Sequence, residues 1–96
     1  MRTLLRVTVP VEGGNKAIKD GTLQKIVNDS LERLRPEAAY FYSDRGFRTA
    51  LMVIDLKDTS DIPSIAEPFF LGLNATVEFM PVMNAEEVKK GISKAL

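Results

Sequence analysis

The chain has 96 residues, the size of a single domain, and its 13 acidic and 13 basic side chains balance. It has neither cysteine nor histidine, which excludes disulfides, thiolate metal sites and the commonest general base and metal ligand. There is no basic excess for nucleic acid, no signal-peptide pattern, and no apolar run near the roughly 20 residues that cross a bilayer. We therefore expect one cytoplasmic domain, residues 1–96, with no metal, cofactor, nucleic-acid or membrane site.

The first predicted strand covers Thr3–Val9, where apolar and other side chains alternate. Pro10 and the glycines at 13 and 14 are expected to end it in a loop. A helix follows from Thr22, because apolar residues recur at helical spacing until Pro36 stops it. Its start has two alternatives. Asn15 would cap a longer helix running through Gly21, which we favour, whereas Asp20 would cap a shorter one.

Two strands joined by a tight turn come next. The pattern predicts strands over Ala38–Ser43 and Thr49–Asp55, with the turn at residues 44–46. The second strand contains five consecutive apolar residues, 50–54, and is therefore expected to be buried on both faces. An even-length loop places Tyr40 and Tyr42 on the face of Leu51 and Val53, whereas an odd-length loop reverses the faces.

A second helical stripe spans residues 62–73. Ser60 is its expected N-cap and Pro63 lies in its first turn, whereas Pro68 is expected to kink or divide it before Gly72 and Asn74 end it.

A last strand, Ala75–Val82, ends near Pro81 as an edge strand does. Asn84 and Glu87 then form a capping-box pattern that opens a terminal helix. Apolar residues recur in that helix at positions 88, 92 and 96, at four-residue spacing.

This order of elements predicts an α+β, ferredoxin-like βαββαβ fold. It consists of an antiparallel sheet with helices on one face and a short C-terminal helix. The helix-facing side should carry Leu5, Val7, Val9, Phe41, Met52, Ile54, Val77 and Phe79. The other side should carry Leu4, Arg6, Thr8, Tyr40, Tyr42, Leu51, Val53, Asp55, Glu78 and Met80. That second face is too apolar to remain open to water, which indicates an interface or a ligand groove.

The last third of the chain resembles small uncharacterised proteins of the dimeric α+β barrel superfamily. The similar segments are residues 61–70 (Asp-Ile-Pro-Ser-Ile-Ala-Glu-Pro-Phe-Phe), 75–83 (Ala-Thr-Val-Glu-Phe-Met-Pro-Val-Met) and 84–88 (Asn-Ala-Glu-Glu-Val). The resemblance implies a homodimer whose two sheets pack face to face, with space for a pocket between sheet and helices. Similar families include muconolactone isomerases, cofactor-free monooxygenases and haem-handling enzymes. The haem-handling members generally use a histidine ligand, which this chain lacks.

Five polar residues are the candidate ligand-binding set: Arg6, Tyr40, Tyr42, Asp55 and Glu78. Arg6 and Glu78 are expected on neighbouring strands, either orienting an acidic ligand or forming an interface salt bridge. The tyrosines either donate to a ligand oxygen or bury their rings at an interface. Asp55 is either a desolvated base or a solvated acid. No catalytic residue is predicted.

The sequence thus favours a homodimer formed through the sheet face that binds a small acidic or aromatic molecule in a pocket at that face. Two alternatives stay open. One is a cofactor-independent isomerase or monooxygenase, and the other is a purely structural or partner-binding dimer. Whether the protein is an enzyme is left undecided.

Overall fold

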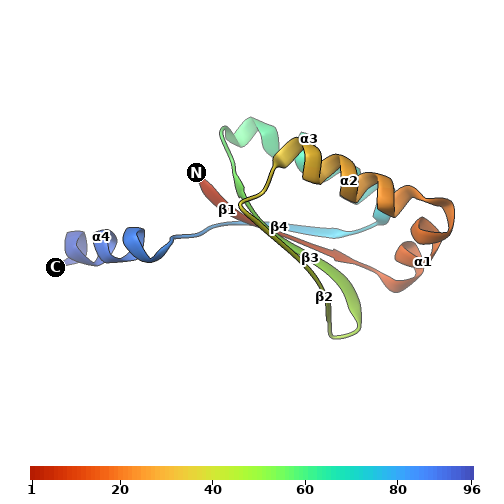
Figure 1. The fold of residues 1–96 in the computed structure, drawn as a ribbon, viewed down its shortest axis with the longest axis horizontal. Coiled ribbons are helices and arrows are strands. Elements are labelled where there is room, and N and C mark those ends of the chain that lie inside the picture. Colours follow the sequence, from red (N-terminus) through yellow and green to blue (C-terminus); the bar gives the residue numbers. More distant parts are fainter.

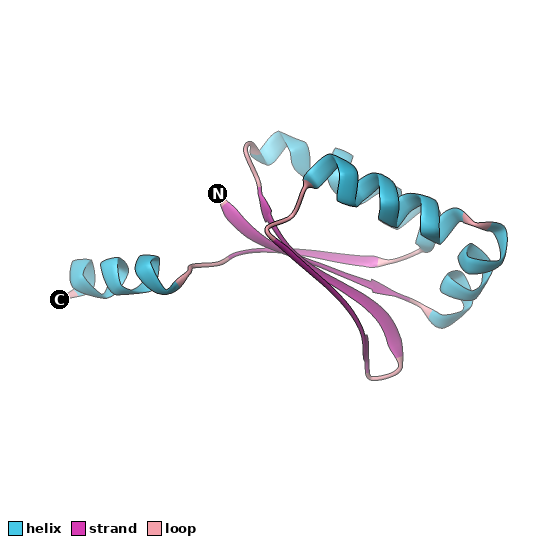
Figure 2. Cartoon of the chain, viewed as in Figure 1, coloured by secondary structure: helices cyan, strands magenta, loops and turns pink.

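A four-stranded antiparallel sheet forms one layer of the structure, a computed structural model of residues 1–96, and three helices lie over one of its faces (Figures 1 and 2). The elements are β1 (Arg2–Val9), α1 (Val11–Asp20), α2 (Thr22–Leu34), β2 (Ala38–Asp44), β3 (Phe47–Asp55), the 3-10 turn η1 (Thr59–Asp61), α3 (Ile62–Leu73), β4 (Thr76–Pro81) and α4 (Ala85–Ala95). The strand order β2-β3-β1-β4 is consistent with the predicted ferredoxin-like arrangement.

The β2–β3 hairpin turns through only two residues, Arg45 and Gly46, because Asp44 pairs directly with Phe47. Both turn residues have positive φ, 52° and 87°, which suits the right-handed twist of the flanking strands. The loop is therefore of even length. The predicted grouping of Tyr40 and Tyr42 with Leu51 is confirmed by the register.

The register also confirms the predicted assignment of residues to the two faces. On the helix-covered face Leu5 pairs with Met52 and with Phe79, and Leu5 is completely buried. The core is formed by Leu5, Val7, Val9, Ala17, Met52, Ile54, Leu56, Ile65, Phe69, Leu73 and Ala75. On the opposite face, Leu4, Leu51 and Val53 are only half-buried, because no element of the chain covers them.

Helix α1 corrects the predicted loop after β1. Gly13 and Gly14 lie inside this helix, although each glycine costs a helix about 1 kcal/mol. Close packing explains the glycine at position 13, where a Cβ atom would lie 2.9 Å from the carbonyl oxygen of Leu73. The favoured long helix through Gly21 is wrong, because Gly21 has a φ of 83° and separates α1 from α2. Asp20 instead accepts a 2.9 Å hydrogen bond from the Thr22 amide at the start of the shorter helix.

Helix α3 begins and ends close to the predicted positions. Pro63 lies in its first turn, and Asn74 ends it in the left-handed region with a φ of 52°. Pro68 does not divide the helix, which runs unbroken to Leu73. Ser60 is not its N-cap, because Ser60 belongs to η1 and donates a hydrogen bond to Asp58 instead.

The C-terminal helix departs from the rest of the molecule. The capping box at its start is confirmed, since Asn84 and Glu87 exchange two 2.9 Å hydrogen bonds. Helix α4 then extends beyond the sheet, away from the other three helices (Figure 1). None of the helices has both the length and the apolar character that a membrane crossing requires.

Candidate functional site

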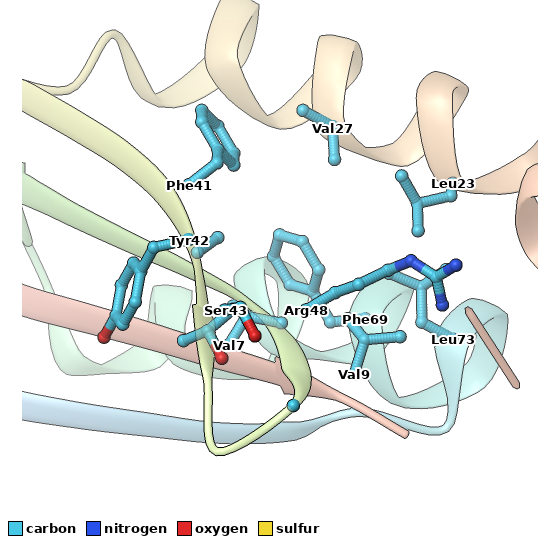
Figure 3. Close-up of a pocket in the computed structure, with 13 residues that line it drawn as sticks. Val7, Val9, Leu23, Val27, Phe41, Tyr42, Ser43, Arg48, Phe69 and Leu73 are labelled. Atoms are coloured by element: carbon cyan, nitrogen blue, oxygen red, sulfur yellow. The ribbon is translucent and has the colours of Figure 1, made fainter. Parts of the chain in front are cut away.

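An apolar cavity of about 370 Å³ lies between α2 and the helix-facing side of the β2–β3 hairpin (Figure 3). It exists because α2 stands off from the sheet: none of its residues is fully buried, whereas α3 buries Ile65, Ala66, Phe69 and Leu73. The volume falls within the range of small-molecule sites.

Thirteen residues from five elements and the hairpin turn line the cavity. Leu23 and Val27 of α2 face Phe41 of β2 across it (Figure 3). The remaining lining residues are Val7, Val9, Tyr42, Ser43, Gly46, Arg48, Thr49, Ala50, Phe69 and Leu73. Phe41 is 53% exposed although it forms a wall, so the cavity opens to solvent beside the hairpin.

Arg48 is the only charged residue of the lining. Its strand position faces the helices, opposite Val9 on β1 and Ser43 on β2. Its guanidinium donates to Oδ1 of Asn15 at 2.9 Å and to the carbonyl oxygen of Val11 at 3.5 Å. No carboxylate lies within ion-pair distance, so the positive charge is not neutralised.

The predicted ligand-binding set lies on the opposite face of the sheet, and the structure brings only part of it together. Tyr40, Leu51, Arg6 and Glu78 form one continuous row across the four strands. Tyr42 lies in the next row, opposite Thr49. Tyr42 borders the cavity along the strand, but its ring points to the uncovered face (Figure 3).

Arg6 is held by two carboxylates. It forms an ion pair with Asp44, at the hairpin end of β2, and its Nε atom lies 3.8 Å from Oε1 of Glu78. The Nε–H group is buried and has no hydrogen-bond partner. Asp44 was expected only as a turn residue, yet its side chain is 24% exposed and supplies the closer of the two partners. Two negative charges therefore surround one positive charge, which disfavours an acidic ligand at Arg6.

Asp55 is separate from this group. It pairs with Arg2 at the far end of the sheet, and its Oδ1 accepts a 2.9 Å hydrogen bond from the N-terminal amine. That hydrogen bond, together with the charge of the amine, lowers the pKa of Asp55 below its ordinary value. A carboxyl group whose pKa is lowered is a weaker base, so the geometry does not favour Asp55 as a desolvated base.

Sequence reasoning missed Arg48 and the apolar walls around it. The available signal was period two: counting back from Met52 and Ala50 places Arg48 on the helix-facing side. The predicted strand began at Thr49, which left Arg48 in the loop. Nothing in the sequence shows that α2 stands away from the sheet, because that distance depends on how the helices pack.

The structure contains no group of three or more acidic side chains arranged to hold a metal ion. Comparison with protein-family models finds no matching family, and comparison with curated proteins finds no matching relative.

Proposed function

We propose that the protein is a homodimeric small-molecule-binding module and that its ligand occupies the cavity between α2 and the β2–β3 hairpin. The observation that carries this proposal is the unneutralised guanidinium of Arg48 in a mostly apolar lining. Small-molecule sites usually combine apolar walls with a few convergent polar groups. This cavity has that composition, with Ser43 as a second polar group.

The lining indicates the chemistry of the ligand. Phe41 and Phe69 favour a flat or aromatic body, since aromatic rings pack well edge to face. Arg48 favours a carboxylate or similar anion at one end, because a guanidinium binds such groups through paired hydrogen bonds. The proposed ligand is therefore a small aromatic or otherwise apolar acid.

The dimer is the second part of the proposal. In a single chain no element covers the sheet face that carries Leu4, Leu51, Val53 and Met80. These side chains lie on the adjacent strands β3, β1 and β4 and form one continuous apolar surface. Packing this face against the same face of a second copy would give a dimeric α+β barrel and bury both apolar surfaces. The Arg6 group would then lie in the interface, where its ion pairs fix the register of the two sheets.

Binding is favoured over catalysis by the composition of the cavity. Its lining holds no carboxylate, so the cavity offers no carboxylate base for proton transfer. Isomerases and monooxygenases with similar folds are therefore a weaker analogy for this chain, since function depends on the site and not on the fold.

The test is a thermal-shift titration with aromatic carboxylates and their neutral carboxamides. We expect the acids to stabilise the wild type, and Arg48→Gln to weaken their binding about tenfold without affecting the carboxamides. Arg45→Gln is the matched control. It removes the same positive charge three residues away, from a side chain that is 84% exposed and does not line the cavity.

The variant Arg6→Ala separates the two faces. Loss of binding in Arg6→Ala with retention in Arg48→Gln would move the site to the uncovered face, as the sequence predicted. If no compound stabilises any of the proteins, the binding proposal is wrong and a purely structural dimer is the better description.

A further inference from the structure

The apolar stripe of helix α4 packs against nothing within its own chain. Every residue from Met83 to Leu96 is exposed, including the apolar stripe of Val88, Ile92 and Leu96. Because α4 extends beyond the sheet, the molecule is 53 Å long and has a radius of gyration of 15.1 Å. A compact domain of this length would have a radius of gyration of about 12.5 Å.

An isolated helix of this length should not be stable. Helices shorter than about 12 residues are marginal in water, and α4 has 11 residues with Gly91 in its interior. Tertiary packing of an apolar face normally supplies the missing stability. The stripe of α4 therefore requires a surface to pack on.

The start of α4 is fixed so that it points away from its own sheet. Val82 donates a 3.2 Å hydrogen bond to the carbonyl oxygen of Arg2, which extends the β1–β4 ladder past Pro81. Arg2 also pairs with Glu87 in the first turn of α4. Glu87 is itself held by the capping box with Asn84. These contacts direct the helix beyond the end of β4 and away from the sheet (Figure 1).

A complementary surface lies at the opposite corner of the same sheet. The β2–β3 hairpin exposes four aromatic side chains. Tyr40 (66% exposed), Tyr42 (42%) and Phe47 (40%) lie on the uncovered face, whereas Phe41 (53%) lies on the helix-facing side. The β4–α4 arm, residues 76–96, exposes Met80, Met83, Val88, Ile92 and Leu96. Thioether and aliphatic side chains pack favourably on aromatic rings. Within one chain β1 lies between the hairpin and β4 and keeps the two surfaces apart.

We infer that the β4–α4 arm packs on the β2–β3 hairpin of a second copy, reciprocally, and closes the mouth of that copy's cavity. This inference rests on the proposed homodimer. The arm leaves the sheet at one corner, and the hairpin lies at the diagonally opposite corner. When two sheets pack face to face about a two-fold axis perpendicular to that diagonal, the corner with the arm in each copy lies over the corner with the hairpin in the other. Phe41, Ser43 and Gly46 belong both to the hairpin and to the cavity lining, so an arm that reaches around the β2 edge to the helix-facing side covers the opening.

The size of the interface supports a second copy as the occupant. A four-stranded face of this length covers roughly 480 Å², less than the roughly 800 Å² that each partner buries in a standard interface. Each copy adds one arm helix and the helix-facing side of one hairpin, which the four-stranded face does not include; each of the two covers roughly 160 Å², and together they bring the total close to that value. The sheet face alone is too small, and the exchanged arm supplies the remainder.

Cross-linking tests the contact directly, because the natural chain has no cysteine. Protein carrying Ile92→Cys is mixed and re-equilibrated with protein carrying Tyr40→Cys, Phe41→Cys or Phe47→Cys, and a short bismaleimide is added. We expect a covalent dimer of the two different chains with at least one hairpin cysteine. Ser93→Cys is the matched control, since residue 93 lies off the apolar stripe and should cross-link about fivefold less.

Alkylation of Val27→Cys, inside the cavity, tests the closure. We expect its reaction with a maleimide to become about tenfold faster when Ile92→Asp is added, and to change less than about twofold with Ser93→Asp. Equal rates in the three proteins would overturn the closure, with circular dichroism confirming that each is folded.

Light scattering on the wild type distinguishes the two possible failures. If the protein is a dimer and no hairpin cysteine cross-links to Ile92→Cys, the arm inference is wrong and the proposed dimer stands. If the protein is a monomer, the proposed dimer fails and the arm inference fails with it.

Discussion

The two faces of the sheet are made by the same four strands, yet they differ in almost every physical respect. On the helix-facing side, Leu5 and Met52 pair across β1 and β3 with at most 2% of their surface exposed. On the other side their sequence neighbours Arg6 and Leu51 also pair, but remain half-exposed. One face is completed by the chain's own helices, whereas the other requires a partner. Adjacent residues of one strand can therefore serve folding and association separately.

The largest effect is expected from Met52→Asp. The new carboxylate would enter a core formed by Leu5 and Phe69 with no partner for its charge, at a cost of several kcal/mol, comparable to the whole stability of a small domain. We expect an unfolded protein by circular dichroism. Lys89→Ala, on exposed α4, should change the free energy of unfolding by less than about 0.5 kcal/mol. Similar melting of the two variants would contradict the assignment of faces.

Leu51→Asp moves the same substitution by one residue, to the uncovered face. We expect this variant to stay folded, because a charge at a half-exposed position remains hydrated, but to lose the proposed dimer. Size-exclusion chromatography with light scattering at micromolar concentration measures the change of mass. A folded dimer in this variant would show that the uncovered face is not the interface.

The Arg6 group allows a finer comparison, because two arginines approach the same carboxylate. Arg6 is 31% exposed and pairs with Asp44, whereas Arg45 is 84% exposed with its Nε atom 3.8 Å from Asp44. We expect Arg6→Ala to destabilise the protein by about 1–3 kcal/mol, since it leaves Glu78 without a counter-charge and Asp44 with only the exposed Arg45. Arg45→Ala should cost less than about 0.5 kcal/mol. Chemical denaturation measures both, and equal losses would assign Arg6 no special structural role.

The smallest effect concerns Asp55 at the edge of the uncovered face. Its pKa is lowered in the folded protein by the hydrogen bond and charge of the N-terminal amine. The interaction of the Asp55 carboxylate with the amine therefore stabilises the folded protein above the pKa of about 3.9 that an aspartate has in the unfolded chain. This stabilisation is lost as the pH falls through the lower pKa of Asp55 in the folded protein. We expect Asp55→Asn to melt slightly lower than wild type at neutral pH, and the difference to vanish at low pH. Glu67→Gln, at an exposed carboxylate without an ion pair, should show no such trend. A difference that persists in acid would exclude this ion pair as its cause.

The sequence by itself determined the strands and their faces. Side chains alternate along each strand, so a local pattern in β1 and β3 was enough to separate Leu5 and Met52 from Arg6 and Leu51. The capping box of α4 is also local, because its geometry depends on neighbouring residues alone. The turn was predicted at residues 44–46 with its length left open, and the pairing of Asp44 with Phe47 decides that it has two residues.

Only the tertiary structure decided where the cavity lies and which residues meet across the sheet. The break at Gly21 lets α1 and α2 take different directions, and the distance of α2 from the hairpin then leaves space beside Arg48. The ion pair of Arg6 with Asp44 likewise joins residues 38 positions apart in the sequence. The ion pair of Arg2 with Glu87, at the start of α4, joins residues 85 positions apart. Such contacts depend on the twist of the sheet and the packing of whole helices, which no local pattern of residues records.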